Sequence, residues 1–343
     1  MAGGEMDTVT LSMGSGGLHS SRLLSEVFLP IYGNEILNTL DDSAALTVDT
    51  AHLAFTTDSY TIQPIFFPGG DIGKLSICGT VNDLAAKGAR PLAISAAFII
   101  EEGFPIEDLK KIARSMRETT DALGVNIVTG DTKVVRRGDA DGIFITTSGI
   151  GAIIEGMDIS SSRARPGDDI LISGTIADHG MAVLNAREGL GFTPEIRSDV
   201  APLCDIVAGI SAWGGLLHVM RDPTRGGVAS ALNEIARASR VTMTLFENRL
   251  PLRQEVRSCC DLLGMDPLYI ANEGKLVIVA DPGAGADILK VIKAMPLGRD
   301  AAVIGRVDEM PYADQIPPVS LQTKIGTKRF VPLLEGEPLP RIC

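Results

Sequence analysis

Residues 66–89, FFPGGDIGKLSICGTVNDLAAKGA, decide the fold of this chain. The stretch opens on a glycine turn, Pro68-Gly-Gly-Asp, and apolar residues then recur at helical spacing along one face: Leu75, Cys78, Val81, Leu84 and Ala85. We therefore expect a helix over 71–88. Backbone N–H groups at a glycine turn before a helix can bind phosphate, although such turns are usually only turns.

Strands and helices alternate outward from this stretch. Strands are predicted over 53–57, ending at Asp58, over 92–100, over 125–129, stopping at Gly130 and Asp131, and over 142–154, with a helix over 106–123. The second half repeats the rhythm, with strands at 170–173, 241–246, 276–280 and 301–307 and helices at 181–188, 200–212, 227–238, 252–263 and 284–294. This pattern predicts two α+β domains.

Two changes in composition divide the chain. The polar stretch 160–169, with its Pro and Gly, predicts an N-terminal domain over 1–157 and a C-terminal domain over 158–330. From 331 the chain reads VPLLEGEPLPRIC, whose prolines discourage both helix and central strand. We expect a flexible, extended tail over 331–343 that ends in a cysteine.

Composition bounds the possible partners and compartment. The formal net charge of -12 disfavours nucleic acid and anionic membranes as partners. The N-terminus has no secretory signal, and the longest apolar run, 91–100, is far shorter than a membrane span of about 20 residues. The five cysteines are odd in number and irregularly spaced, which argues against a disulfide framework. We expect a cytoplasmic protein.

Several isolated acids are candidate metal ligands. They share tight contexts of Gly, Thr and Asn, and they are Asp42, Asp58, Asp83, Asp131 and Asp222. Taken singly, each is better explained as a solvated acid or a helix cap. Taken together they predict a Mg²⁺-ATP site, because Mg²⁺ binds carboxylate oxygens and nucleotide phosphates. The glycines of Met13-Gly-Ser-Gly-Gly (Gly14, Gly16, Gly17) are candidate phosphate contacts, and the chain has no P-loop motif.

Three further residues could take part in chemistry. Lys133 follows Asp131 in Gly-Asp-Thr-Lys, and Glu273 lies in Asn-Glu-Gly-Lys just before an apolar strand. Each is either a solvated turn residue or a charge and a base at the mouth of a site. The terminal Cys343 has no packing rationale, so it is either a chance residue or a thiol on a swinging arm that carries a covalent group.

These motifs together resemble the HypE family of hydrogenase maturation factors, within the aminoimidazole ribonucleotide synthetase-like (PurM-like) ATP-binding superfamily. The resemblance covers essentially the whole chain. It rests on GSGG at 14–17, TTDSY at 56–60, the stretch 66–89, VTGDTKVV at 128–135, ISGTIADHG at 172–180, RDPTRGG at 221–227, NEGKLVIV at 272–279 and the terminal PRIC. Met13 departs from the pattern, since family members often have His before GSGG.

The resemblance implies a two-domain PurM-like fold whose N-terminal sheet pairs with its mate in a homodimer. It implies ATP and Mg²⁺ between the domains, with Gly130, Asp131 and the other candidate acids at the phosphates. It also implies loading of Cys343 by the carbamoyltransferase HypF and transfer of cyanide to a HypC–HypD complex. Dehydrating a thiocarbamate to a thiocyanate needs ATP to activate the amide oxygen and a base for the nitrogen protons. Glu273 is the expected base, and Lys133 is expected to stabilise negative charge.

Two other functions fit parts of the sequence. A sister enzyme, acting on thiamine phosphate, selenide or a purine precursor, would not need Cys343. A non-enzymatic carrier that only presents a thiol would not need the candidate acids. The resemblance, which includes the acids, the glycine turns and the terminal cysteine together, implies instead an ATP-dependent carbamoyl dehydratase that serves [NiFe] hydrogenase assembly.

Overall fold

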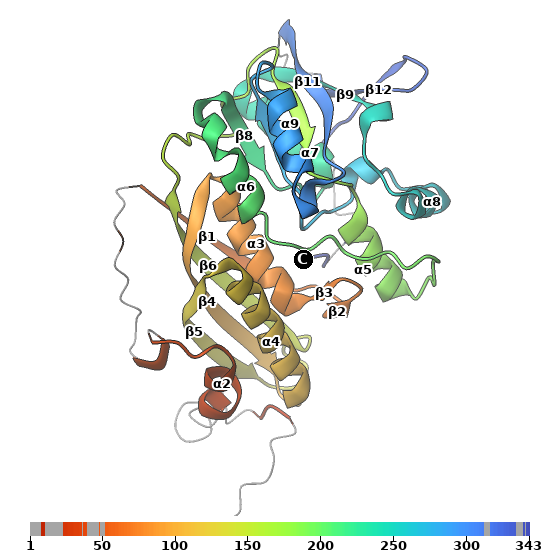
Figure 1. The fold of residues 1–343 in the computed structure, drawn as a ribbon. Helices are drawn as coiled ribbons and strands as arrows, with labels where there is room; N and C mark the ends of the chain where they lie inside the picture. Colours follow the sequence, from red (N-terminus) through yellow and green to blue (C-terminus); the bar gives the residue numbers. More distant parts are fainter. Residues whose placement is uncertain are drawn as a thin grey trace, which may run out of the picture.

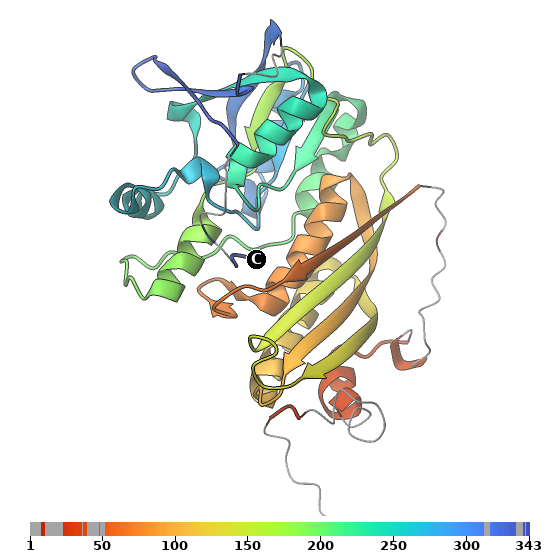
Figure 2. The same cartoon turned by 180° about the vertical axis from the view of Figure 1, so that it is seen from behind.

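The structure, a computed structural model, describes residues 8–10, 23–35, 37–39, 48, 52–311, 316–333, 339 and 341–343. Figures 1 and 2 show two layered halves, with the C-terminus lying between them. Among the described residues, no helix is long and apolar enough to cross a membrane.

The first half is built on a four-stranded sheet in the order β1-β6-β4-β5. Its strands are β1 (Leu53–Tyr60), β4 (Ala89–Glu101), β5 (Asn126–Val135) and β6 (Ile143–Ile153). Only β4 and β5 run parallel. Helices α3 (Ile72–Ala86) and α4 (Ile106–Leu123) cover one face of this sheet, and the small pair β2 (Phe66–Phe67) and β3 (Gly70–Asp71) precedes α3 (Figure 1).

The second half is built on a seven-stranded sheet in the order β13-β12-β9-β11-β7-β10-β8. Its strands are β7 (Asp169–Ile172), β8 (Leu217–Arg221), β9 (Val241–Phe246), β10 (Val277–Ala280), β11 (Ala302–Pro311), β12 (Val319–Gln322) and β13 (Lys328–Phe330). Its helices are α5 (Asp178–Glu188), α6 (Cys204–Ile210), α7 (Gly227–Ser239), α8 (Gln254–Leu263) and α9 (Gly285–Lys293). The shorter helical segments are η2 (Leu24–Phe28), α2 (Leu29–Tyr32), η3 (Leu37–Thr39), η4 (Ser211–Leu216), η5 (Glu247–Arg249), η6 (Pro267–Tyr269) and η7 (Pro296–Gly298).

Alternating side chains bury both faces of the second sheet. Ile170 and Ile172 of β7 belong to the apolar cluster that includes α7. Leu171, between them, belongs to the cluster of α6 and α9 on the other face. Successive side chains of a strand point to opposite faces of the sheet. A strand that is apolar at every position therefore buries side chains on both faces, and helices cover both faces here. The predicted α+β class is confirmed.

Several predicted boundaries were wrong. The strands predicted to end at Asp58 and at Gly130 run on to Tyr60 and Val135, because polar residues are tolerated on the exposed face of the first sheet. The helix predicted over 200–212 is only α6, since Pro202 lies in the extended stretch before it. The short strands β8, β12 and β13 were not predicted, because runs of three to five residues carry little periodic signal.

Candidate active site

A cavity of about 170 Å³ lies between the two halves of the molecule. Its lining is mostly polar: Asp58 and Asp83 come from the first half, Arg221, Asp222 and Glu273 from the second, and Cys343 from the tail.

The first half supplies two carboxylates at this cavity. Asp58 lies on β1 and Asp83 on α3, and Thr56 Oγ1 donates a 2.7 Å hydrogen bond to Asp83 Oδ2. Burial is the main cause that raises the pKa of Asp83 above its usual value. The hydrogen bond from Thr56 opposes this shift, and the neighbouring Asp58 carboxylate adds to it. A Cβ at Gly79, one turn earlier on α3, would come within 2.2 Å of the Tyr60 hydroxyl, so only glycine fits there.

The second half supplies Asp222, directly after β8. Burial, and to a smaller extent the Asp83 carboxylate, raise the pKa of Asp222 to about 7. Arg221 beside it pairs with Glu234 of α7 at the rim of the cavity. Arg225 and Thr224 of the same loop also line the cavity, which places cationic and hydroxyl donors opposite the acids.

Glu273 is the most deeply buried acid of the cavity, with 3% of its surface exposed. Its Oε1 has no hydrogen-bond partner among the described residues. Burial and then Asp222 raise its pKa well above the usual range. Its backbone N–H donates to Asp199 Oδ1 at 3.2 Å, and a Cβ at Gly274 would come within 1.8 Å of the Asp199 carbonyl oxygen. The turn is therefore held against Asp199 with the Glu273 side chain facing the cavity.

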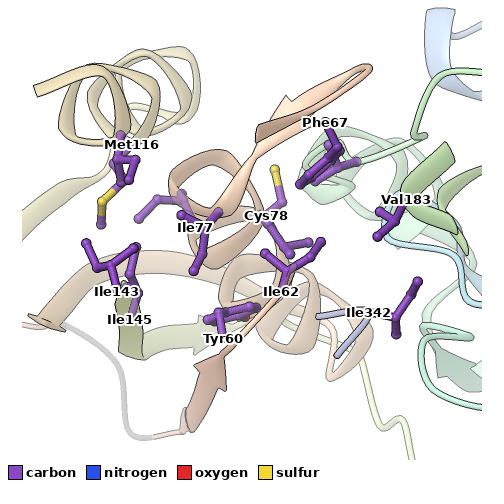
Figure 3. Close-up of a cluster of buried hydrophobic side chains, with 14 of the residues drawn as sticks. Tyr60, Ile62, Phe67, Ile77, Cys78, Met116, Ile143, Ile145, Val183 and Ile342 are labelled. Atoms are coloured by element: carbon purple, nitrogen blue, oxygen red, sulfur yellow. The ribbon is translucent and has the colours of Figure 1, made fainter. Parts of the chain in front are cut away.

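The end of the tail is docked between the two halves. Its backbone follows residues 61–63, since Thr61 N–H donates to the Cys343 terminal oxygen at 3.1 Å and Gln63 N–H to the Arg341 carbonyl at 3.3 Å. Ile342 is only 2% exposed and packs in the cluster that contains Ile62, Phe67 and Val183 (Figure 3). The tail was predicted to be flexible, and in this structure its last residues bring Cys343 to the cavity.

The acids at the cavity suit a Mg²⁺-nucleotide. Asp58, Asp83 and Asp222 are close enough to one another to raise a pKa, so a divalent cation would relieve their repulsion. Among the described residues, no three His, Cys, Asp or Glu side chains are close enough together to hold an ion by themselves. Mg²⁺ in nucleotide sites usually keeps several waters and takes one or two carboxylates plus substrate phosphates, so these acids would hold it together with a bound nucleotide.

Other predicted site residues lie away from this cavity or outside the described chain. Asp131 and Lys133 form an exposed ion pair on β5, with 2.9 Å between Lys133 Nζ and Asp131 Oδ2, and they do not line the cavity. Gly130 lies on the same strand, packed against the Ala96 carbonyl. The described residues do not include Asp42, Gly14, Gly16, Gly17 or Met13.

Four residues at or next to the site were not predicted from the sequence. Asp199 holds the Glu273 turn, and His179 bonds to the docked tail through Nε2 and the Ile342 carbonyl oxygen, 2.7 Å apart. Arg221 and Arg225 line the cavity. His179 lies in ISGTIADHG and both arginines in RDPTRGG, so these motifs carried the only available signal.

Comparison with known proteins agrees with this arrangement. The N-terminal domain of the AIR synthase related protein family matches residues 40–153, and its C-terminal domain matches residues 165–313. A protein named carbamoyl dehydratase HypE from Bradyrhizobium diazoefficiens is 49% identical over 336 residues, which are 98% of this chain and 96% of that one.

Solved structures of HypE proteins are similar to this chain over nearly its whole length. A crystal structure of the hydrogenase maturation protein HypE in complex with ATP superimposes with a TM-score of 0.92 at 46% identity, covering 97% of this chain and 99% of that one. The HypE chain of a HypE–HypF complex superimposes with a TM-score of 0.79 at 48% identity, covering 92% and 99%. The chain belongs to the HypE family of carbamoyl dehydratases, within the AIR synthase related proteins.

Proposed function

We propose that this chain uses ATP to dehydrate an S-carbamoyl group on its own Cys343 to a thiocyanate, which donates cyanide to iron during [NiFe] hydrogenase maturation. One observation carries the proposal. The terminal Cys343 lines an acidic cavity together with Glu273, a buried acid whose Oε1 has no hydrogen-bond partner among the described residues. A thiol that carries the substrate and a base that could act on it are thus brought to one place by segments far apart in the sequence.

The reaction divides into two balanced steps. First, the amide oxygen of Cys343–S–C(=O)–NH₂ attacks the γ-phosphorus of ATP, ADP leaves, and one N–H proton is lost, giving an imidate phosphate. Second, the remaining N–H proton is removed, the C–O bond breaks and phosphate leaves, giving Cys343–S–C≡N. ATP is needed because phosphate leaves readily where oxide does not. ADP and phosphate are the other products.

Glu273 is the proposed base for the nitrogen protons. Burial and then Asp222 raise its pKa, which makes its carboxylate a stronger proton acceptor than an exposed Glu. Removing a positioned base of this kind typically costs 10²–10⁴-fold in rate. Water must be kept away from the activated imidate, and the docked tail places Ile342 in the apolar cluster directly beside the cavity.

Mg²⁺ and the phosphates would be held by Asp58, Asp83 and Asp222, with Arg221 and Arg225 as phosphate donors. When bound, Mg²⁺ would neutralise charge on the transferred phosphoryl group. Asp42 and the glycines 14, 16 and 17 stay predicted phosphate-side contacts, on the sequence alone. The ATP complex of a HypE relative supports nucleotide binding in this fold.

Asp131 and Lys133 require a second copy of the chain to reach this site. The side chains of β1 alternate between faces, and Asp58 faces α3. Asp58 is aligned across the sheet with Ala96 and Gly130, so their side-chain positions share one face. Asp131 is the next residue along β5, so its side chain lies on the opposite, outer face. That face exposes Phe55 (74%), which suits the predicted homodimer. We propose that Asp131 and Lys133 act at the cavity of the partner subunit.

The proposed partners follow from the chemistry of the thiol. Cys343 would be loaded by a HypF carbamoyltransferase and would deliver cyanide to a HypC–HypD complex. A HypE–HypF complex exists for a relative, which supports the first of these contacts. Loading by a separate enzyme requires the tail to leave the cavity, and dehydration requires it to return.

Replacing the terminal thiol tests the proposal. We expect Cys343→Ala to bind ATP normally and to form no thiocyanate in the presence of an active carbamoyltransferase. Cys204→Ala, a half-buried thiol that bonds to the Val81 carbonyl, is the matched control and should form thiocyanate at the native rate. Protein-bound thiocyanate in Cys343→Ala would reject the proposal.

A further inference from the structure

We infer that His179 is a positioning residue that holds the tail in its docked state and thereby places the Cys343 thiol at the cavity. The inference rests on the function proposed above. His179 is fully buried near the start of α5, and its Nε2 lies 2.7 Å from the carbonyl oxygen of Ile342. Ile342 directly precedes Cys343, so this bond fixes the backbone one residue from the reacting sulfur.

The hydrogen bonds around the ring assign its tautomer. The Ile342 carbonyl can only accept, so His179 Nε2 carries the proton and donates. The other nitrogen, Nδ1, then accepts from Ser198 Oγ at 2.8 Å, and Ser198 Oγ accepts in turn from Val200 N–H at 3.1 Å. Of these bonds, only the one from Nε2–H depends on the docked tail.

The same loop also supports the proposed base. Ser198 orients His179, and the next residue, Asp199, accepts from the backbone N–H groups of Glu273 and Gly274, each at 3.2 Å. The loop is itself fixed by Ser198 N–H, which donates to the Pro68 carbonyl at 2.8 Å. One short rigid segment therefore places both the tail and Glu273.

The ring of His179 packs against apolar neighbours on the side where the tail docks. The edge of the ring meets Phe67 with centroids 5.5 Å apart, and Ile342 packs in the same apolar cluster (Figure 3). When the tail leaves for loading, Nε2–H exchanges the carbonyl oxygen for water. An intramolecular hydrogen bond is modestly favoured over one to water, so His179 biases the tail towards docking.

Two substitutions separate this role from a general effect on folding. His179→Phe keeps a ring against Phe67 and removes the hydrogen bond, and His179→Gln restores an N–H donor at a similar position. His218→Gln is the matched control, because His218 is the other buried histidine among the described residues, bonds to Asp168 at 2.7 Å, and does not line the cavity. Losing one hydrogen bond shifts an equilibrium by roughly 10-fold.

Three rates are then measured on the full-length chain. These are alkylation of Cys343 by iodoacetamide, followed on the C-terminal peptide, carbamoyl loading by the partner transferase, and single-turnover dehydration with Mg²⁺-ATP. We expect His179→Phe to be alkylated roughly 10-fold faster, to load at least as fast as the unaltered chain, and to dehydrate roughly 10-fold more slowly. His179→Gln and His218→Gln should remain close to the unaltered chain in all three.

Opposite outcomes overturn the inference. An unchanged alkylation rate in His179→Phe means that this residue does not hold the tail. Loading and dehydration that fall together in His179→Phe point to a damaged fold. If the unaltered chain itself fails to dehydrate, the proposed function fails, while the alkylation rates still decide whether His179 anchors the tail.

Discussion

At the scale of single residues, Glu273 can be tested apart from the loading of Cys343. We expect Glu273→Gln to accept the carbamoyl group at the native rate and to dehydrate it about 10²–10⁴-fold more slowly, because the proposed base is lost. Single-turnover mass spectrometry follows the two steps separately. Glu118→Gln, exposed on α4 and outside the cavity lining, is the control and should dehydrate at close to the native rate. A native rate in Glu273→Gln would remove this residue from the reaction.

Asp222 makes the stability of the metal-free chain depend on pH. Burial and then Asp83 raise its pKa to about 7 in the folded state, against about 3.9 for an Asp in an unfolded chain. A carboxyl with a raised folded pKa binds its proton more tightly when folded. Its contribution to stability is therefore complete below the unfolded pKa and is lost as the pH rises through about 7.

Asp222→Asn tests this dependence, because the amide cannot ionise. We expect the variant to raise the urea midpoint of the metal-free chain most at about pH 8, where Asp222 is ionised in both states, and clearly less at about pH 5, where only the unfolded state is ionised. An equal change at both pH values would contradict the assignment of the raised pKa to Asp222.

At the scale of elements, α3 connects the turn at 68–71 to the cavity. Asp71 caps the helix, since its Oδ1 accepts from Gly73 N–H at 2.7 Å and from Lys74 N–H at 3.2 Å. We expect Asp71→Ala to lower the free energy of unfolding by about 1 kcal/mol. Asp108→Ala, which removes an exposed ion pair with Lys111 on α4, should cost clearly less. Urea unfolding measures the free energy of unfolding of both variants. An equal loss in the two would show that the Asp71 cap stabilises the chain no more than the exposed ion pair does.

The sequence predicted elements best where one periodicity was clear. The helix over 106–123 is found with the predicted bounds, because Ile106, Leu109 and Ile112 recur at helical spacing and face the core. The strands over 53–57 and 125–129 were predicted too short, because Asp58 and Asp131 were interpreted as strand ends. Both acids continue their strands, one towards the cavity and one on the outer face of the sheet.

The site was only partly predictable for a related reason. Motifs identified Asp58, Asp83, Asp222, Glu273 and Cys343, and the fold brings these five to one cavity. Their convergence depends on how the two sheets pack and where the tail docks, which no local pattern contains. Asp199 bonds to the backbone of Glu273, and His179 bonds to the backbone of Ile342. Nearly every residue type has these backbone groups, so no sequence motif predicts the two contacts.

At the scale of the whole molecule, the exposed outer face of the first sheet raises the question of whether one active site uses residues from two subunits. Lys133→Ala and Asp222→Asn should each be inactive alone. If Lys133 serves the partner's cavity, a mixed dimer of the two variants contains one intact site. We therefore expect a statistical mixture to recover about a quarter of the native dehydration rate in a two-fold symmetric dimer. No recovery, with mixed dimers shown to form, would contradict action across the interface.

The central claim is that this chain is both the carrier and the dehydratase of one carbamoyl group. Intact-protein mass spectrometry tests it most directly. The chain is incubated with the carbamoyltransferase and carbamoyl phosphate, and then with Mg²⁺-ATP, with Cys343→Ala as control. We predict a mass gain of one carbamoyl group, followed by the loss of one water only after ATP is added, and neither change in the control. A gain that persists unchanged with ATP would leave a carrier without the chemistry, and no gain with an active transferase would contradict the claim entirely.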